Sequence, residues 1–249
     1  MKLFVVLACL AAPGTFPFVD AATVIPANSF SSFSTYWNNF YPWGTDHNGS
    51  GRMASANIIV ASNTLSLIAT PTSNPSPPTS TSNPKPAIHY ASGAIHAKEH
   101  ITVTAANAYT VSGEFSAPTA VGTWPAFWLT AVSGWPPEVD IGEWKGTADN
   151  WFNTFNTSSV VKSTLVDWPT DLSFHSVKAV LTAQSNNKDV KIDFYMDNKF
   201  IVTQYGSGFV GKAMYLIINL QMEGSSGSPG PSGRTVYKAR NVQVTRTGN

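Results

Sequence analysis

Three acidic side chains fall within six positions of this sequence. Glu138, Asp140 and Glu143 lie in the aromatic segment WPPEVDIGEW, residues 135–144. On a regular strand Glu138 and Asp140 share one face, whereas Glu143 points to the opposite face, where an unpaired carboxylate inside a core is costly. One extra residue at Ile141–Gly142, where glycine tolerates a bulge, would return Glu143 to the face of the other two. The spacing therefore predicts a bulged strand that presents three acids on one surface.

This arrangement suits the hydrolysis of a glycosidic bond with retention of configuration. A bulged span from Glu138 to Glu143 covers roughly 13 Å, and two side chains that each reach about 4 Å inward leave a gap of about 5 Å, the separation that this reaction requires. Asp140 could hydrogen-bond one glutamate, so that one stays ionised as the nucleophile and the other protonated as the acid. The alternative is a solvated strand edge with three unrelated acids, because strands commonly expose Glu and Asp on a polar face.

The composition favours an uncharged partner. The 249 residues are 43% apolar and only 12% charged, with a formal net charge of +1, which excludes a disordered chain and a charge-laced helical protein. Lys and Arg are spread along the chain without a cluster, so nothing points to nucleic acid or to an anionic membrane surface. We expect a monomer whose partner is a neutral polysaccharide, with neither nucleic acid nor membrane involved.

Residues 1–22 have the pattern of a secretory signal peptide. A basic residue precedes the apolar run Leu3–Ala12, and small residues precede the predicted cleavage point, as a signal peptidase requires. An apolar core of about ten residues is too short for a bilayer span, which needs about 20. Cleavage would also remove Cys9, the only cysteine. The sequence thus predicts a secreted, extracellular protein in which residues 23–249 form a single domain.

Short runs with a two-residue period predict an all-β chain. β-branched and aromatic residues recur in these runs between clusters of Gly, Pro, Asn or Ser, and no stretch of twelve residues carries a helical stripe. Such a pattern favours a two-sheet antiparallel β-sandwich or jelly roll, in which one concave face usually holds an extended ligand. Residues 70–86 contain six prolines, and we expect a loop there rather than an interdomain linker. The expected strands include residues 57–60, 64–68, 101–103, 109–111, 176–181, 190–195, 215–220 and 236–244.

Two other motifs match known site patterns without the structural context that those sites need. Residues 206–213 satisfy GxGxxG, but the segment after them has the pattern of a strand, whereas a phosphate loop must open a helix. Residues 96–100 match the inverted zinc-peptidase pattern HxxEH, yet residues four apart on a strand lie roughly 13 Å apart, too far for one zinc. We expect no cofactor, and no acidic loop predicts calcium. Asn48 and Asn156 fit the N-glycosylation pattern.

The acidic segment and the residues before it resemble a known family. The motif E-aliphatic-D-aliphatic-x-E, which follows WPAFWL at residues 124–129, is similar to the active-site strand of glycoside hydrolase family 16. The resemblance implies a concanavalin A-like β-jelly roll that acts on β-linked polysaccharides. It continues in order along nearly the whole chain after the signal, in residues 90–95, 112–115, 174–177, 192–198 and 214–224.

Carried over position by position, the resemblance implies roles for single residues. Glu138 matches the nucleophile, Glu143 the general acid/base and Asp140 the assisting carboxylate. The residue that corresponds to His175 begins a strand far from the cleavage point, so we expect a structural hydrogen bond there rather than catalysis.

Tryptophans and one asparagine are the expected substrate-binding residues. Trp124 and Trp128 match the family's tryptophans near the cleaved bond, and Trp144 would add a wall. Flat sugar faces present C–H groups that pack on indole while the indole N–H can donate; ordinary core packing is the alternative for each tryptophan. Asn153 lies in a segment where many family glucanases instead carry a sugar-contacting histidine.

The expected activity is that of an extracellular retaining endo-glycosidase that hydrolyses β-1,3-linked galactan or glucan. In the family an arginine often follows the glycine in the strand before Trp124, whereas this chain has Glu114 after Gly113. Residues 46–50, 135–137 and 219–224 look more like the fungal branch that includes endo-β-1,3-galactanases. A transglycosylase acting on the same substrates and a non-catalytic, lectin-like jelly roll are the alternatives.

Overall fold

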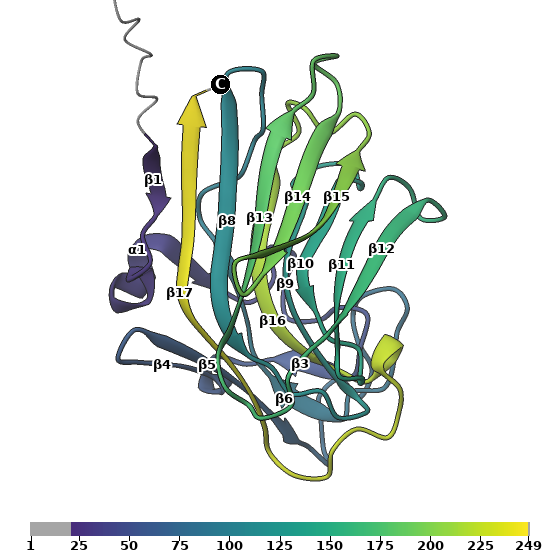
Figure 1. Ribbon diagram of the computed structural model, residues 1–249. Coiled ribbons are helices and arrows are strands. Elements are labelled where there is room, and N and C mark those ends of the chain that lie inside the picture. The colour runs from purple at the N-terminus through teal and green to yellow at the C-terminus, as the bar shows by residue number, and fades with distance from the viewer. Residues whose placement is uncertain (1–20, 249) are drawn as a thin grey trace, which may run out of the picture.

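Two β-sheets pack face to face in the computed structural model, which describes residues 21–248 (Figure 1). Neighbouring strands pair antiparallel except β3 and β6. The all-β, two-sheet antiparallel jelly roll predicted from the sequence is confirmed. The predicted signal peptide, residues 1–22, lies outside the described residues apart from its last two positions. Its cleavage and the secreted location stay predictions.

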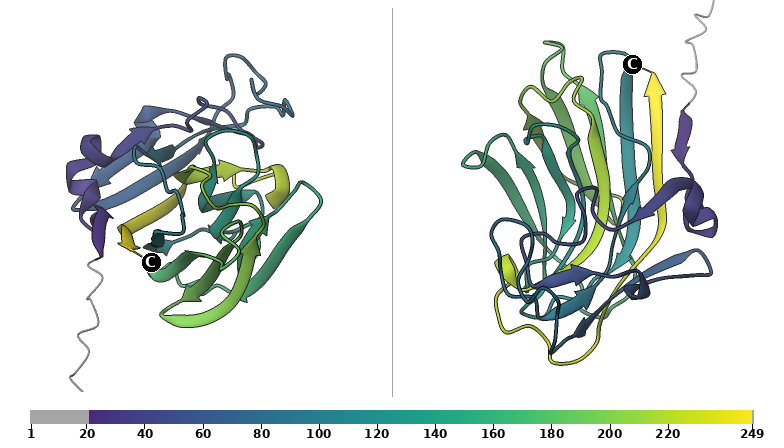
Figure 2. Two further views of the ribbon diagram at one scale, coloured as in Figure 1. Left: turned by 90° about the horizontal axis from the view of Figure 1, so that it is seen from above. Right: turned by 180° about the vertical axis from the view of Figure 1, so that it is seen from behind.

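The ten-stranded and seven-stranded sheets curve along each other, and the strands of both follow roughly the same direction (Figure 2). The ten-stranded sheet has the spatial order β15 (Lys199–Gly206), β14 (Val190–Met196), β13 (His175–Ala183), β8 (Asn107–Ser116), β17 (Thr235–Gly248), β5 (Thr64–Pro71), β6 (Tyr90–Ser92) and β3 (Gly51–Met53), with β1 (Ala22–Ile25) on β17 and β4 (Ile58–Ala61) on β5. The seven-stranded sheet has the order β12 (Val161–Asp167), β11 (Asp149–Phe155), β10 (Glu138–Glu143), β9 (Thr123–Ala131), β16 (Met214–Met222), β7 (Ala94–Ala97) and β2 (Trp37–Asn39). Helix α1 (Phe33–Tyr36) is a single turn, and 3₁₀ turns lie at Ser29–Ser32, Ser55–Asn57 and Gly224–Ser226.

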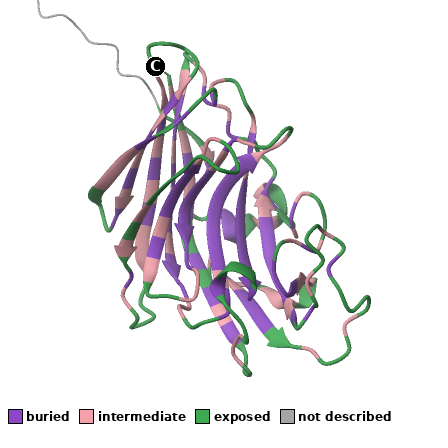
Figure 3. Cartoon of the chain, turned by 90° about the vertical axis from the view of Figure 1, so that its right-hand side faces the viewer, coloured by how far each residue is buried: buried purple, intermediate pink, exposed green. Residues whose placement is uncertain are grey.

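The core lies between the sheets, where alternate side chains of each strand meet. Phe127 and Leu129 of β9 are fully buried, and the ring of Phe127 lies 4.7 Å from that of Phe115 on β8 in the other sheet. Buried residues form bands across the middle of the sandwich, and exposed residues gather in the connecting loops (Figure 3). Burying one such side chain stabilises folding by about 1.5–3 kcal/mol. The apolar alternation therefore decides which face of each strand points inward and which is left for a site.

Strand β10 carries the bulge predicted at Ile141–Gly142. Its register against β9 shifts between Asp140 and Gly142, and Ile141 is fully buried on the core side. A Cβ at position 142 would lie 2.7 Å from Cη2 of the Trp144 ring, so only glycine lets this tryptophan pack against the strand. The bulge returns Glu143 to the same face as Asp140, and the local prediction is confirmed.

The proline-rich loop, residues 72–89, connects two neighbouring antiparallel strands of one sheet, β5 and β6. Within it the amide of Ile88 donates to the carbonyl of Pro78 (2.8 Å) and the amide of Ser80 to that of Pro86 (2.8 Å). The segment is therefore a folded loop, as predicted, rather than a linker.

The segments that match GxGxxG and HxxEH both lie on strands and turns. Residues 206–213 end β15 and lead into β16 without forming a helix. His96 is on β7 and His100 lies beyond its end, each with its ring against the edge of Tyr215 (6.0 and 4.9 Å between centroids). Between residues 21 and 248, no helix is long and apolar enough to cross a bilayer.

Candidate active site

A cavity of about 710 Å³ opens on the face of the seven-stranded sheet that points away from the core. Its floor holds Glu138, Asp140 and Glu143 from β10. The neighbouring strand β9 adds Trp124 and Trp128 beside them. Five of the seven residues that were predicted to form a site are therefore brought together.

The backbone after the bulge is held by a side chain of the next strand. Regular pairing of β10 with β11 ends at Asp140 and Asn153, and beyond it the amide of Glu143 donates to Oδ1 of Asn150 (2.9 Å). Asn150 is fully buried. An amide left without this acceptor would be costly, so Asn150 stabilises the backbone conformation that turns Glu143 toward the cavity.

Glu143 accepts hydrogen bonds from three donors. Trp124 Nε1 lies 2.8 Å from Oε1, while Lys145 Nζ at 2.9 Å and Asn153 Nδ2 at 2.7 Å both contact Oε2. The residue is 6% exposed. These three donors fix the orientation of the Glu143 side chain, because bonds to charged groups are the strong ones.

Asp140, directly between the two glutamates in sequence, is 4% exposed. Burial raises the pKa of Asp140 well above its usual value, and the negative charges of Glu143 and Glu138 raise it further. The bond from Asn153 Nδ2 (2.8 Å) lowers this pKa but does not reverse the effect. These effects favour the protonated form of Asp140 more than in an exposed aspartate.

Glu138 is shielded from water by neighbouring side chains. Burial raises the pKa of Glu138 to about 7; the hydrogen bond from Trp135 Nε1 (2.7 Å) opposes this shift and the charge of Glu143 adds to it. Near neutral pH the carboxyl group is thus divided between its two forms. A group poised in this way is suited to acid–base or nucleophilic chemistry.

The raised pKa of Glu138 has a consequence for stability. Between pH 4.5 and about 7 the folded chain binds a proton at Glu138 that the unfolded chain has lost, so stability falls as pH rises through this window. We expect Glu138→Gln to match the wild type near pH 4 and to exceed its free energy of unfolding by about 2 kcal/mol at pH 8. Urea unfolding across this pH range measures the difference, with the exposed Glu99→Gln as control. Parallel curves for wild type and Glu138→Gln would contradict it.

Two tryptophans lie where the resemblance implied. Trp124 is half-buried at the cavity, with its indole N–H on Glu143. Trp128 is 6% exposed and donates from Nε1 to Oδ1 of Asn219 (2.7 Å). Each therefore combines an apolar ring with a fixed orientation at the cavity surface.

The prediction that Trp144 adds a wall is wrong. Trp144 is fully buried in the core, and its ring lies 4.7 Å from that of Trp168 and 5.8 Å from that of Tyr237. The physical reason is strand alternation: because the bulge turns Glu143 outward, the next residue points inward.

Asn153 was predicted to bind substrate, and this prediction also needs correction. Asn153 is 1% exposed and does not line the cavity. Its Nδ2 bridges Asp140 and Glu143 from the neighbouring strand β11, since Asn153 lies directly across from Asp140 in the register. It acts on the acids rather than on a sugar.

Several cavity residues escaped sequence reasoning. Trp43 and His47 come from the segment before β3, and their rings lie 5.2 Å apart, with the His47 ring 5.8 Å from that of Trp128. Burial lowers the pKa of His47 to about 4, so this imidazole is neutral at ordinary pH. Asn83 enters from the proline-rich loop and Lys145 from the turn after β10. In the sequence, only the abundance of aromatic residues before β3 indicated that this segment could line a cavity.

The remaining histidine and metal predictions concern regions outside this cavity. His175 Nδ1 lies 2.8 Å from Oδ2 of Asp197, and its Nε2 lies 2.8 Å from Oγ of Ser173, in line with the structural role that we expected. In the part of the chain that the structure describes, no group of three or more His, Cys, Asp or Glu is arranged to hold a metal ion.

The structure is thus a β-sandwich whose seven-stranded sheet carries three acids and two tryptophans at a cavity on its open face. Comparisons with known proteins confirm the resemblance to glycoside hydrolase family 16. SCLam, a non-specific endo-β-1,3(4)-glucanase from family GH16, matches with a TM-score of 0.71 at 15% identity, over 96% of this chain and 95% of that chain. The endo-1,3-β-glucanase from Streptomyces sioyaensis matches with a TM-score of 0.65 at 21% identity, over 96% and 99%. At these identities the matches establish the fold.

Sequence relatives cover a smaller part of the chain. The endo-1,3-1,4-β-glycanases ExsH and EglC of Rhizobium meliloti (strain 1021) are each 31% identical to it over 121 residues, which is 45% of this chain and 24% of each relative. The match thus spans about a quarter of the length of these curated relatives. No family model matches the chain.

Proposed function

We propose that this protein is a secreted endo-β-glycanase that cleaves β-1,3-linked glucan or galactan with retention of configuration. The observation that carries the proposal is the bulge of β10, which places Glu138, Asp140 and Glu143 together on the cavity floor. Retaining glycosidases need two carboxyl groups that face one sugar from a common site. The tryptophans of β9 supply flat surfaces for sugar rings beside these acids.

The reaction runs in two displacements. The carboxylate of Glu138 attacks the anomeric carbon while Glu143 gives its proton to the departing oxygen, so the glycosidic bond breaks and an ester to Glu138 forms. Water then attacks the same carbon, its proton passes to Glu143, and Glu138 leaves as a carboxylate. Both acids end in their starting forms, and the sugar keeps its configuration.

The contacts of Glu143 differ from those that this reaction starts with. Lys145, Trp124 and Asn153 all donate to Glu143, whereas burial raises the pKa of Asp140 well above its usual value and the pKa of Glu138 to about 7. We infer that a bound sugar displaces Lys145 and that a proton then moves to Glu143 from its acidic neighbours. Asn153, bonded to both Asp140 and Glu143, holds these two acids side by side for that transfer.

The bridging amide gives a prediction of its own. We expect Asn153→Ala to lower kcat by about 10- to 100-fold, because small misplacements of catalytic groups are costly, and to change KM by less than twofold, because the side chain does not reach the cavity. Steady-state kinetics on the polysaccharide would show this, with thermal unfolding to recognise a misfolded variant. A raised KM with unchanged kcat would instead support the original expectation of a substrate contact.

The glucan form of the proposal has the broader support. The relatives named above are endo-1,3-1,4-β-glycanases, and the matched structures are endo-β-1,3(4)- and endo-1,3-β-glucanases. Galactan is favoured only by the sequence pattern of residues 46–50, 135–137 and 219–224. In either case, among the described residues the cavity lining carries a single Lys or Arg, Lys145, which donates to Glu143. The other binding contacts must therefore suit a neutral sugar chain.

Product analysis on a defined panel tests the proposal. The purified protein is incubated with laminarin, mixed-linkage β-glucan and β-1,3-galactan, and the products are sized by mass spectrometry. We expect a ladder of oligosaccharides from at least one β-1,3-linked polymer, with β-configured reducing ends in the first NMR spectra. Longer products from short oligosaccharides would indicate transglycosylation at the same ester, and binding without any product would favour the lectin-like alternative.

A further inference from the structure

The proline-rich loop reaches from one sheet of the sandwich to the site on the other. Its flanking strands, β5 and β6, belong to the ten-stranded sheet, yet Asn83 near its far end lines the cavity above the seven-stranded sheet. The side chain of Asn83 is exposed and makes no hydrogen bond to any described residue. An amide in this position has two donors and an acceptor free.

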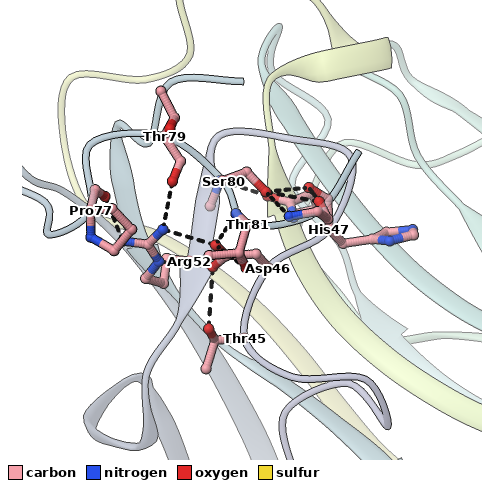
Figure 4. A network of polar contacts seen from close by, with 11 residues as sticks. Thr45, Asp46, His47, Arg52, Pro77, Thr79, Ser80 and Thr81 are labelled. Carbon is pink, nitrogen blue, oxygen red and sulfur yellow. Dashed lines mark hydrogen bonds and ion pairs between the residues drawn. The ribbon is translucent and has the colours of Figure 1, made fainter. Parts of the chain in front are cut away.

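An ion pair between Arg52 of β3 and the buried Asp46 holds the loop in place. Arg52 donates from Nε to Oδ1 of Asp46 and from Nη2 to Oδ2, both at 2.8 Å. The same guanidinium donates to two loop carbonyls, those of Pro77 (2.7 Å) and Thr79 (2.9 Å). Figure 4 shows the arginine between these carbonyls and the carboxylate. One cation thus ties the segment before β3 to the loop.

The carboxylate of the pair also accepts from the loop. Oδ2 of Asp46 takes the amide of Thr81 (2.8 Å) and its hydroxyl (3.0 Å) (Figure 4). Asp46 is 3% exposed; burial alone would raise its pKa, but the bonds from Arg52 and Thr81 outweigh burial and lower the pKa to about 2. The pair therefore stays charged at any pH where the protein would work. Planar bidentate pairs of this kind hold their geometry well.

A second anchor joins the loop to the cavity wall. The hydroxyl of Ser82 donates to the main-chain carbonyl of His47 (2.8 Å), and that of Ser80 lies 3.4 Å from the same oxygen. The His47 ring points away from these bonds (Figure 4) and packs against Trp128. Trp128 lies across from Asp140 in the pairing of β9 with β10. His47 therefore connects this part of the site to Ser82, the residue before Asn83.

We propose that the proline-rich loop is a fixed wall of the substrate cleft and that the amide of Asn83 binds a hydroxyl of a sugar unit beyond the one at the acids. The ligand is a neutral β-linked polysaccharide chain, and Asp46 and Arg52 are the positioning pair that holds the wall. This inference rests on the proposed function. It adds a subsite on the side of His47 and makes the loop a determinant of chain length and register.

Binding measurements test this subsite apart from catalysis. In the Glu138→Gln background, calorimetry gives the Kd of laminari-oligosaccharides and β-1,3-galacto-oligosaccharides from two to eight units. We expect Asn83→Ala to weaken binding of the longer oligosaccharides by about three- to tenfold, the effect of a lost neutral hydrogen bond, and to leave the shortest unchanged. Asn74→Ala, an exposed asparagine of the same loop outside the cavity lining, is the matched control. Equal losses at all lengths, or no loss, would overturn the inference.

Kinetics then separate this inference from the proposed function. With Glu138 intact, we expect Asn83→Ala to raise KM for the polymer three- to tenfold, to change kcat by less than twofold, and to shift the cleavage positions in end-labelled oligosaccharides. An active wild type with an unchanged Asn83→Ala variant overturns the subsite and leaves the function intact. An inactive wild type whose oligosaccharide binding depends on Asn83 refutes hydrolysis and supports the wall.

The positioning pair has its own variant. Arg52→Met removes four hydrogen bonds of the clamp, and we expect it to reproduce the KM effect of Asn83→Ala without adding to it in the double variant, because both act on one contact. The exposed Arg234→Met is the matched control, and thermal unfolding reports any loss of folding. Additive effects of the two substitutions would overturn the positioning role, while the Asn83 result stands independently of how Arg52→Met folds.

Discussion

Replacing Glu138 with alanine will reduce turnover of the polysaccharide by at least about 10³-fold, because no covalent intermediate can form without the carboxylate. The substitution removes a group whose burial is unfavourable near neutral pH, so we expect the variant to fold. Release of reducing ends from laminarin and β-1,3-galactan, followed over several hours, measures the loss. The exposed Glu99→Ala tests the same change of residue away from the cavity and should keep wild-type turnover.

A small external nucleophile sharpens this experiment. The space left by the Glu138 side chain opens on the cavity, so azide can reach the anomeric carbon from that face. We expect azide to restore part of the activity of Glu138→Ala on a substrate with a good leaving group and to yield the α-configured glycosyl azide. If the folded variant hydrolyses the polymers as fast as the wild type, Glu138 is not the nucleophile. The same test assigns the second glutamate. If azide restores activity in Glu143→Ala and the product is the β-configured glycosyl azide, Glu143 is the acid–base group and not the nucleophile.

Replacing Glu143 with glutamine will lower turnover of the polysaccharide by about 10²- to 10⁴-fold, the usual contribution of a placed general acid. Glutamine keeps an acceptor for the indole N–H of Trp124 and cannot give a proton to a departing sugar oxygen. We expect a much smaller loss for formation of the ester from a dinitrophenyl glycoside, whose leaving group needs no proton. The measurement is the ratio of the rate loss on the polysaccharide to the rate loss on the dinitrophenyl glycoside. A large ratio assigns Glu143 as the acid, and Glu99→Gln is the control.

The pH dependence of Glu143→Gln adds an independent check. The pKa of Glu138 is about 7. With an activated leaving group, which needs no proton, kcat/KM of Glu143→Gln should therefore rise with pH up to about neutrality as the nucleophile ionises. A profile that stays flat between pH 5 and 8 would show that Glu138 is not the group that attacks.

The acidic strand could be predicted from local sequence because the forces that shape it act within a few residues. Alternation places Ile141 and Trp144 in the core, and the cost of burying a carboxylate excludes Glu143 from it. Only an extra residue satisfies both demands, and Gly142 is the position where the neighbouring ring leaves no room for a Cβ. The same alternation also predicts that Trp144 faces inward, so its assignment as a cleft wall overlooked a rule that the sequence already contained.

The role of Asn153 depended on strand register. Its residue type suits a sugar contact as well as a bridge between acids, and the sequence does not say which residue of β10 it opposes. In the structure it lies across from Asp140, beneath the cavity surface. Register between two strands is set by the packing of both faces along their whole length, which is why this assignment required the fold.

By itself the sequence determined the all-β architecture, the bulge and the identity of the three acids, because each follows from short-range periodicity and burial. Only the tertiary structure decided that His47 and Asn83 line the same cavity as these acids, since they come from loops that are distant in sequence. It also decided the acidity of these groups, because the raised pKa values of Asp140 and Glu138 arise from the exclusion of water by the assembled site. Desolvation and contacts between distant segments exist only in the folded chain, and the sequence therefore identifies the three acids without their pKa shifts or the loops that line the cavity around them.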